Sequence, residues 1–141
     1  FKVKICDSPK HVTDTCNLII TTTAATEPIL FADDIQSGTH ITAMGSDTPA
    51  KQELDPNIMK KADCVVADSI SQCIERGEIS HALKDGKLTK NNIVELGHVL
   101  NGQHPGRTAQ DQITVADLTG VAVQDIQIAT AVYESFMENE S

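Results

Sequence analysis

The stretch Gly38-Thr-His-Ile-Thr-Ala-Met-Gly-Ser-Asp-Thr-Pro-Ala-Lys-Gln-Glu-Leu-Asp-Pro56 decides how this sequence folds. Residues 41–44 form a short, uncharged and mainly apolar run, which is typical of a buried strand. A turn of small residues follows and carries one acid, Asp47, before a helix begins. Open α/β sheets bind ligands at the carboxyl ends of their strands. The pattern therefore places the Asp47 carboxylate at a candidate binding edge.

The rest of the chain repeats this alternation of short apolar strands with helices. Helix-forming patterns lie between the strands, and Asp55-Pro56 is suited to open one of the helices. Alternating strands and helices predict an α/β fold, a parallel sheet with helices on both faces. Strands are expected at residues 1–6, 17–20, 41–44, 63–68 and 114–118, with 17–20 fully buried, and helices at 9–15, 54–62, 71–83 (with Gly77 inside), 93–100 and 122–137.

The glycine pattern of a dinucleotide-binding fold is absent from these 141 residues. Such a fold begins with a strand, a G-x-G-x-x-G turn and a helix, with an acid about 20 residues later. If the fold is of the Rossmann type, the chain holds only its later strands. The chain also opens within a strand-like run and without Met, so we expect it to be a piece of a longer protein.

Composition argues against several classes of partner. The net charge of -9 disfavours nucleic acid and anionic membrane surfaces, which both require a basic surface. No apolar run is long enough to span a membrane, and no signal peptide is evident, so we expect a cytoplasmic protein. No metal site is expected, because neither the histidines nor the four cysteines have ligand spacing. The cysteines are Cys6, Cys16, Cys64 and Cys73.

Three features could carry chemistry, and each also has a purely structural explanation. Spacing alone explains Asp47 more readily as a turn or helix-cap residue than as a general acid/base. Lys51 is more readily a solvated lysine, although it could reach toward a cofactor. The hydroxyls of residues 21–23 could satisfy loop backbone, or could bind a ribose or diphosphate at the end of a strand.

Four strings of this sequence resemble the ornithine cyclodeaminase/μ-crystallin family, and their order and spacing run nearly the length of the chain. The wording of the second and fourth is most similar to the ectoine-utilisation branch. The strings are Ile19-Ile-Thr-Thr-Thr23 with Glu27-Pro-Ile-Leu30; Gly38-Thr-His-Ile-Thr-Ala-Met-Gly-Ser-Asp47 with Lys51, Glu53, Leu54 and Asp55; Glu95-Leu-Gly-His-Val-Leu-Asn-Gly102 with Pro105-Gly-Arg107; and Ile113-Thr-Val-Ala-Asp-Leu-Thr-Gly-Val-Ala-Val-Gln-Asp125.

The resemblance implies a Rossmann-type NAD(P)-binding domain and a second domain for substrate binding and dimerisation. Residues 1–121 would be the later part of the first domain, without its glycine pattern. Residues 122–141 would form a long helix that returns toward the second domain. The parent protein would be a homodimer. The piece alone would be inactive, and it is expected to self-associate through the exposed sheet edge.

The resemblance also assigns roles to individual residues. Asp47 corresponds to the family's catalytic acid/base, and Asp47 and Thr119 would contact the substrate. Where Leu118-Thr119 stands here, the cyclodeaminase pattern has a serine before an apolar residue, so the exact substrate stays open. The residues that would bind NAD or NADP are Thr23, Ile41, Thr42, Ala43, Met44, Lys51 and Leu118.

The activity implied is that of an NAD-dependent ornithine cyclodeaminase. In that reaction bound NAD takes a hydride from the amino acid's α-carbon, the side-chain amine attacks the imine, ammonia leaves, and the returning hydride gives proline. Two alternatives stay open. One is an oxidoreductase that reduces imino acids (a ketimine or pyrroline-carboxylate reductase) or resembles alanine dehydrogenase. The other is a non-catalytic binding protein like μ-crystallin, which lacks the acid found here at Asp47.

Overall fold

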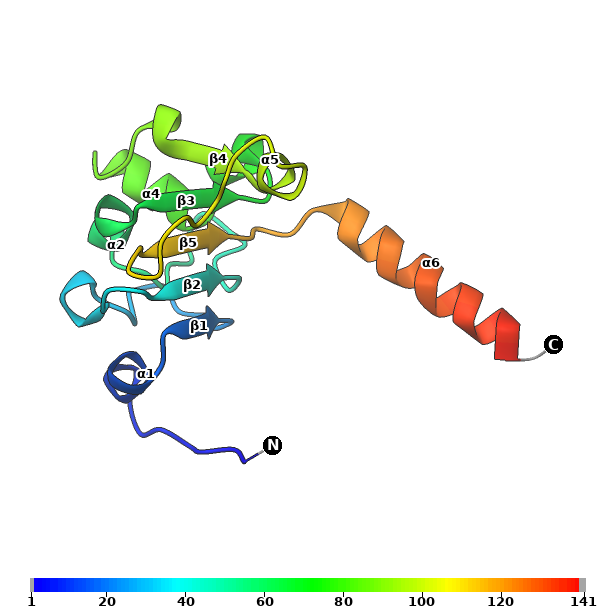
Figure 1. Cartoon of the computed structure of the whole chain (residues 1–141), viewed down its shortest axis with the longest axis horizontal. Helices are drawn as coiled ribbons and strands as arrows, with labels where there is room; N and C mark the ends of the chain where they lie inside the picture. Colours follow the sequence, from blue (N-terminus) through cyan, green and yellow to red (C-terminus); the bar gives the residue numbers. More distant parts are fainter. Residues whose placement is uncertain (1, 140–141) are drawn as a thin grey trace.

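Five parallel strands form a single sheet in a computed structural model that describes residues 2–139. The order across the sheet is β1-β2-β5-β3-β4, so the last strand of the chain lies in the centre (Figure 1). In register, Ile41 of β2 pairs with Ile19 of β1 on one side and with Val115 of β5 on the other. The strands are β1 (Leu18–Thr21), β2 (His40–Ala43), β3 (Cys64–Ala67), β4 (Ile93–Glu95) and β5 (Thr114–Asp117).

Short helices lie between the strands, and one further helix lies at each end of the described chain. The start of the second helix is as predicted: Asp55 accepts a hydrogen bond from the Asn57 amide, and Pro56 occupies the first helical position, where its missing N–H costs nothing. The helices are α1 (Pro9–Thr15), α2 (Pro56–Lys61), α3 (Ile70–Cys73), α4 (Glu78–Lys84), α5 (Leu96–Leu100) and α6 (Ala122–Asn139), with 3-10 turns η1 (Ala32–Asp34) and η2 (Lys90–Asn92).

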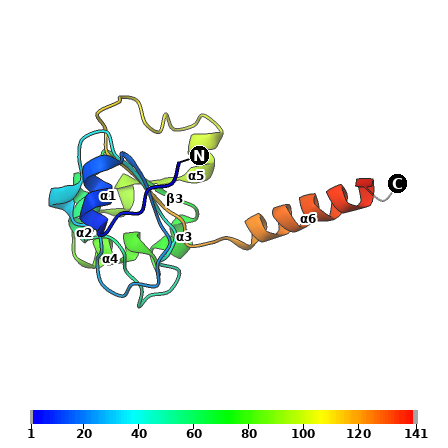
Figure 2. The ribbon, with the colours of Figure 1, turned by 90° about the horizontal axis from the view of Figure 1, so that it is seen from below.

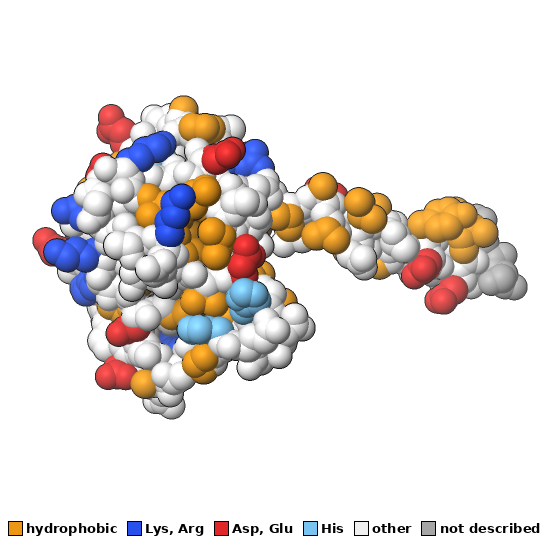
Figure 3. All heavy atoms as spheres, turned by 90° about the horizontal axis from the view of Figure 1, so that it is seen from above, with side chains coloured by type: hydrophobic (Ala, Val, Ile, Leu, Met, Phe, Trp, Pro, Cys, Tyr) orange, Lys and Arg blue, Asp and Glu red, His pale blue; other side chains and the backbone are white. Residues whose placement is uncertain are grey.

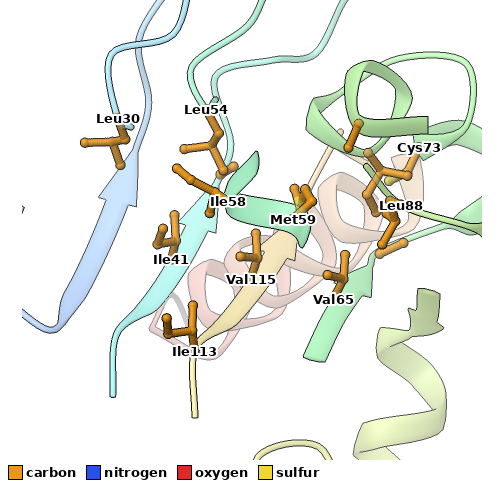
Figure 4. Packing of buried hydrophobic residues seen from close by; sticks show 14 of the residues in the cluster. Leu30, Ile41, Leu54, Ile58, Met59, Val65, Cys73, Leu88, Ile113 and Val115 are labelled. Carbon is orange, nitrogen blue, oxygen red and sulfur yellow. The ribbon is translucent and has the colours of Figure 1, made fainter. Parts of the chain in front are cut away.

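The core lies on one face of the sheet. Alternate residues of β2, β3 and β5 point to this face, where α2 and α4 cover them. Figure 4 shows how closely these aliphatic side chains pack. On the opposite face lie α5 and the loop after it (Figure 2). They line an open cleft of about 410 Å³ that includes His40 and Thr42. The core side chains include Ile41, Val65, Val115, Ile58, Met59 and Ile79.

The first predicted strand is wrong for the residues that the structure describes. Residues 2–6 form no strand, and Val3 and Ile5 are almost fully exposed; Phe1 lies outside the described residues. The prediction that residues 17–20 are fully buried is also wrong, because Leu18 is 63% and Ile20 59% exposed. Both side chains belong to an edge strand and point to the face that lacks the α2 and α4 helices.

Two of the predicted helices have different boundaries. The helix expected at 71–83 is divided into α3 and α4 by Gly77, whose φ of 85° and ψ of -177° no helix accommodates. The helix expected at 93–100 begins instead as strand β4, which pairs with β3. A run of only three residues, Ile93–Glu95, is too short for its period to distinguish a strand from a helix.

The long helix predicted from residue 122 is present as α6, and it extends away from the sheet (Figure 1). Residues 140 and 141 of the region lie outside the described residues. Hydrophobic side chains spread along α6 in the space-filling view (Figure 3). Within residues 2–139, none of the helices combines the length and apolarity required to cross a bilayer. The exposed hydrophobic residues of α6 are Val123, Ile126, Ile128, Val132, Tyr133, Phe136 and Met137.

Gly77→Ala should destabilise the protein by roughly 3 kcal/mol or more, because its backbone conformation is nearly restricted to glycine. A Cβ at this position would also lie 2.7 Å from Asp117 Oδ2. Gly86→Ala is the matched control: its φ is 64°, but a Cβ there meets nothing within 4 Å, so about 1 kcal/mol is expected. Urea unfolding measures both, and equal losses would contradict the steric argument.

Candidate active site

The topology brings three loops together at the carboxyl edge of the sheet. They follow β1, β2 and β5, which are adjacent strands although β5 lies far along the sequence. Backbone hydrogen bonds extend the sheet beyond the strands: Met44 N donates to Thr21 O at 2.9 Å, and Leu118 N donates to Ala43 O at 2.9 Å. The predicted positions on these loops are therefore neighbours in space.

The predicted residues of β2 differ in what they can offer a ligand. The side chains of Ile41 and Ala43 are buried in the core, and both residues are paired with β1 and β5. Thr42 points to the opposite face, where its hydroxyl lies 3.1 Å from His40 Nε2. Met44 follows the strand and is half exposed. Of these four predicted positions, only Met44 presents an exposed side chain at the edge itself.

Asp47 and Lys51 form an ion pair in the loop after β2. Lys51 Nζ lies 2.7 Å from Asp47 Oδ1, and both side chains remain accessible to solvent. The hydrogen bond from Lys51 is the main cause that lowers the pKa of Asp47 below its usual value. Asp47 lies in the loop just before the turn at residues 49–50, and the cap of the following helix α2 is Asp55. The pair is thus an accessible carboxylate held in its ionised form by an ammonium group.

The main chain of Lys51 is fixed from two sides, which leaves its side chain to pair with Asp47. Ser46 Oγ donates a hydrogen bond of 2.6 Å to the carbonyl oxygen of Lys51. The same oxygen lies 2.8 Å from His81 Nε2, on helix α4. These contacts close the loop between Ser46 and Lys51, so Asp47 lies on a short segment with both ends anchored.

A fully buried carboxylate, that of Glu53, lies beneath these loops. Its Oε1 accepts from the Thr23 amide at 2.5 Å and from Thr23 Oγ1 at 2.8 Å. Its Oε2 accepts from Thr21 Oγ1 at 2.6 Å and from the Gly45 amide at 2.9 Å. The predicted cofactor residue Thr23 therefore already has a partner on the protein side, although the residue itself is exposed.

Two more buried acids support this arrangement from below. Glu78 at the start of α4 accepts from the amides of Glu53 (2.7 Å) and Leu54 (3.0 Å). Asp117 at the end of β5 accepts from the Ile79 amide at 2.8 Å. Burial, opposed by these hydrogen bonds, raises the pKa of Glu78 to about 7. Burial is also the main reason that the pKa of Asp117 is raised to about 7.

Asp68 anchors the loop after β5 in a similar way. Its Oδ1 accepts from Thr119 Oγ1 at 3.3 Å, and its Oδ2 accepts from the Gly120 amide at 2.9 Å. Thr119 is buried, and its hydroxyl faces Asp68. Leu118 is partly exposed and continues the edge beside Met44. In this conformation Leu118 is the residue of the loop that is more available to a ligand.

The four acids that support the loops were not predicted from the sequence; they are Glu53, Asp68, Glu78 and Asp117. Glu53 stands in one of the family strings, but the residues around it give no sign that its side chain is buried. Glu78 follows the helix-breaking Gly77, and Asp117 ends an apolar strand; an acid directly after such features is the one available signal. Within the described part of the chain, no three His, Cys, Asp or Glu side chains gather to hold a metal ion.

The exposed groups at this edge fit one end of a dinucleotide. Thr23 offers a hydroxyl oxygen whose proton is donated to Glu53, Lys51 offers a cation, and Met44 and Leu118 offer partly exposed apolar side chains. A hydroxyl and a cation suit a ribose and a phosphate, and apolar side chains suit the face of an aromatic ring. The sequence contains no G-x-G-x-x-G turn, so the usual cradle for the pyrophosphate is not among these residues.

The chain is similar in sequence and in fold to several known proteins. An uncharacterized cyclodeaminase of Sinorhizobium fredii is 41% identical over 142 residues, which cover 100% of this chain and 43% of the relative. An archaeal alanine dehydrogenase dimer with bound NAD has a TM-score of 0.82 at 38% identity, covering 89% of this chain and 39% of its own. The Thermococcus litoralis Δ1-pyrroline-2-carboxylate reductase, in complex with NADH and L-proline, has a TM-score of 0.87 at 27% identity, covering 96% and 42%.

These matches confirm the predicted Rossmann-type α/β fold, because the similar structures are NAD-bound dehydrogenases and reductases. The chain spans about two fifths of the length of the relatives it matches. The relatives are named as an uncharacterized cyclodeaminase, an alanine dehydrogenase and reductases, so their names do not agree on one reaction. The model of the ornithine cyclodeaminase/mu-crystallin family matches residues 1–140, and the chain belongs to that family.

Proposed function

We propose that the protein to which this chain belongs is an NAD(P)-dependent enzyme that moves a hydride at the α-carbon of an amino acid or of the matching imine. The observation that carries the proposal is the Asp47–Lys51 pair at the carboxyl edge, beside the loops of Thr23, Met44 and Leu118. That edge is where sheets of this class bind their ligands. The relatives solved with NAD or NADH support the choice of cofactor.

The side chains of this chain bind and orient the reacting groups. Thr23, Lys51 and the strand residues 41–43 would hold the cofactor, and Met44 and Leu118 would shield it from water. When bound, NAD supplies the hydride acceptor or donor that protein side chains cannot provide. Asp47 handles the proton: Lys51 keeps its carboxylate ionised, so Asp47 can accept a proton from the substrate amine or water and return it later.

Cyclodeamination of L-ornithine to proline and ammonia is the first candidate reaction. The cyclodeaminase relative supports it, as does the resemblance of the Gly38–Asp47 string. Reduction of an imine to the amino acid is the second candidate. It is favoured by Leu118-Thr119, where the cyclodeaminase pattern has a serine before an apolar residue, and by relatives named as reductases. Membership of the ectoine-utilisation branch, a cytoplasmic location and the choice between NAD and NADP stay predictions.

The arrangement of the whole protein is also a proposal. We infer that α6 leads from the NAD(P)-binding domain toward a substrate domain, because its hydrophobic residues lack any cover from the sheet in this structure. A homodimer is proposed as well, and one similar structure is a dimer. The small-molecule substrate would then lie between the carboxyl edge and the second domain, as substrate sites commonly lie at domain interfaces.

The deciding experiment incubates the intact protein with NAD and L-ornithine and follows proline and ammonia. Formation of both supports cyclodeamination. Oxidation of NADH or NADPH in the presence of a cyclic imine, or of pyruvate with an amine, supports the reductase. If neither reaction occurs, the enzyme proposal fails and a binding protein like μ-crystallin is the better explanation.

Asp47→Asn should lower kcat of the intact enzyme by about 10²-fold or more, since a general acid/base contributes on that order. Asn keeps the shape of the side chain and cannot carry the proton. Asp85→Asn, in the exposed turn after α4, is the control and should keep full activity. Circular dichroism verifies that both variants are folded. Full activity of folded Asp47→Asn would exclude the proposed role.

Lys51→Met should shift the acidic limb of the kcat/KM profile to higher pH. Lys51 lowers the pKa of Asp47, so the ionised carboxylate persists to lower pH when Lys51 is present. Without the ammonium group the pKa of Asp47 returns toward its usual value, and activity is lost at a higher pH as the medium is acidified. Lys60→Met, an exposed position on α2, should leave the limb unmoved. An unshifted limb in Lys51→Met would show that Asp47 does not set it.

A further inference from the structure

We propose that Glu53 is a positioning residue, which holds the Thr23 loop and the Asp47 loop at a fixed separation. The inference rests on the proposed function, because those two loops are there assigned to the cofactor and to proton transfer. Glu53 itself is fully buried and reaches neither ligand. Its effect would therefore pass through the backbone and hydroxyl groups that it binds.

The two oxygens of Glu53 connect different strands. Oε1 takes both donors of Thr23, in the loop after β1. Oε2 takes the amide of Gly45, directly after β2, together with Thr21 Oγ1 from β1. The carboxylate thus bridges two loops whose residues are over twenty positions apart in sequence. The spacing of its two oxygens sets the distance between the Thr23 and Gly45 amides.

The approach of the two loops leaves no free space. A Cβ at Gly45 would overlap the carbonyl oxygen of Thr23 and the carboxylate of Glu53. Gly45 is therefore the residue type that lets the Asp47 loop lie directly against the Thr23 loop. With contact this close, a shift of the Glu53 carboxylate must displace Thr23, Gly45 or both.

Glu53 is in turn held in place by its own main chain. Glu78 accepts hydrogen bonds from the amides of Glu53 and Leu54, so the start of α4 fixes the segment that carries the carboxylate. Asp117 accepts from the Ile79 amide and ties α4 to the central strand β5. Through Glu78 and Asp117, the loops after β1 and β2 are therefore connected to the central strand of the sheet.

A carboxylate is required at this position because each group that faces it is a donor. An ionised carboxylate only accepts hydrogen bonds, whereas the amide of glutamine has one accepting oxygen and one donating nitrogen. In Glu53→Gln the nitrogen would face either the Thr23 amide or the Gly45 amide, donor against donor. We therefore expect one of the two loops to detach while the shape of the core is kept.

The test compares Glu53→Gln with Glu95→Gln in the intact protein. Glu95 ends β4, at the edge of the sheet opposite β1, and its Oε1 accepts from the Ile70 amide at 3.0 Å. It is a partly buried carboxylate that also holds a backbone amide and is remote from both loops. Amide hydrogen exchange at Thr23 and Gly45 reports the loops without any cofactor. The dissociation constant of NAD and kcat, measured separately, report the site.

In Glu53→Gln, exchange at Thr23 or Gly45 should accelerate by about tenfold or more, the scale of one lost hydrogen bond to a charged group. The dissociation constant of NAD should rise and kcat should fall by a similar factor. Glu95→Gln should change each of these less than twofold. Unchanged exchange and unchanged NAD binding in folded Glu53→Gln would overturn the inference.

Thr21→Val tests the positioning role of Glu53 if Glu53→Gln fails to fold. It removes one of the four donors and keeps the side-chain shape, so exchange at Gly45 should accelerate in the same direction by a smaller factor. No acceleration there would overturn the inference. If the wild-type protein does not bind NAD, the proposed function fails, and the exchange data alone still decide whether Glu53 fixes the loops.

Discussion

Four hydrogen-bond donors converge on the buried carboxylate of Glu53, and the form of the carboxyl edge depends on this convergence. Parallel strands that end side by side leave backbone amides without partners, and a buried amide left unpaired costs about 1–3 kcal/mol. Glu53 meets that need for the loops after β1 and β2 with one side chain. The neighbouring Asp47 is therefore free to face solvent, because it has no structural task in the core.

Acids in this small fold exist in two contrasting environments. Glu78 and Asp117 are buried, and burial raises the pKa of each to about 7. Asp47 is exposed and paired with Lys51, which lowers its pKa. The buried acids tolerate their environment because they accept backbone amides at the start of α4 and beneath the loops. Of these three acids, only Asp47 is accessible to a ligand.

Much of the fold was predictable, and the failures have specific physical causes. The Asp55-Pro56 start of α2 depends on local backbone chemistry, so the sequence indicated it correctly. Strand β4 was missed because three residues are too few to show a period. Leu18 was expected inside because it is apolar, but its exposure depends on which strands and helices lie beside β1.

The residues of the candidate site were likewise predicted only in part. Thr23, Asp47 and Lys51 were predicted from family strings, and the structure brings Asp47 and Lys51 into contact. Glu53 stood in one of those strings without a role. Whether a glutamate between Gln52 and Leu54 is buried depends on residues from β1 and β2, so no local pattern reveals it. Positions on neighbouring loops were predictable; the support beneath them was not.

The central place of β5 also has a consequence for how the chain acquires its structure during synthesis. Strands β2 and β3 are joined only through β5, and the paired residues His40 and Thr114 are 74 positions apart. Until Asp117 has left the ribosome, the earlier strands have no shared centre on which to assemble. Because non-local pairing slows folding, this domain should emerge as separate strand–helix units that close late and together. Nascent chains released before that point would expose the unpaired edges of β2 and β3, the kind of surface that chaperones bind.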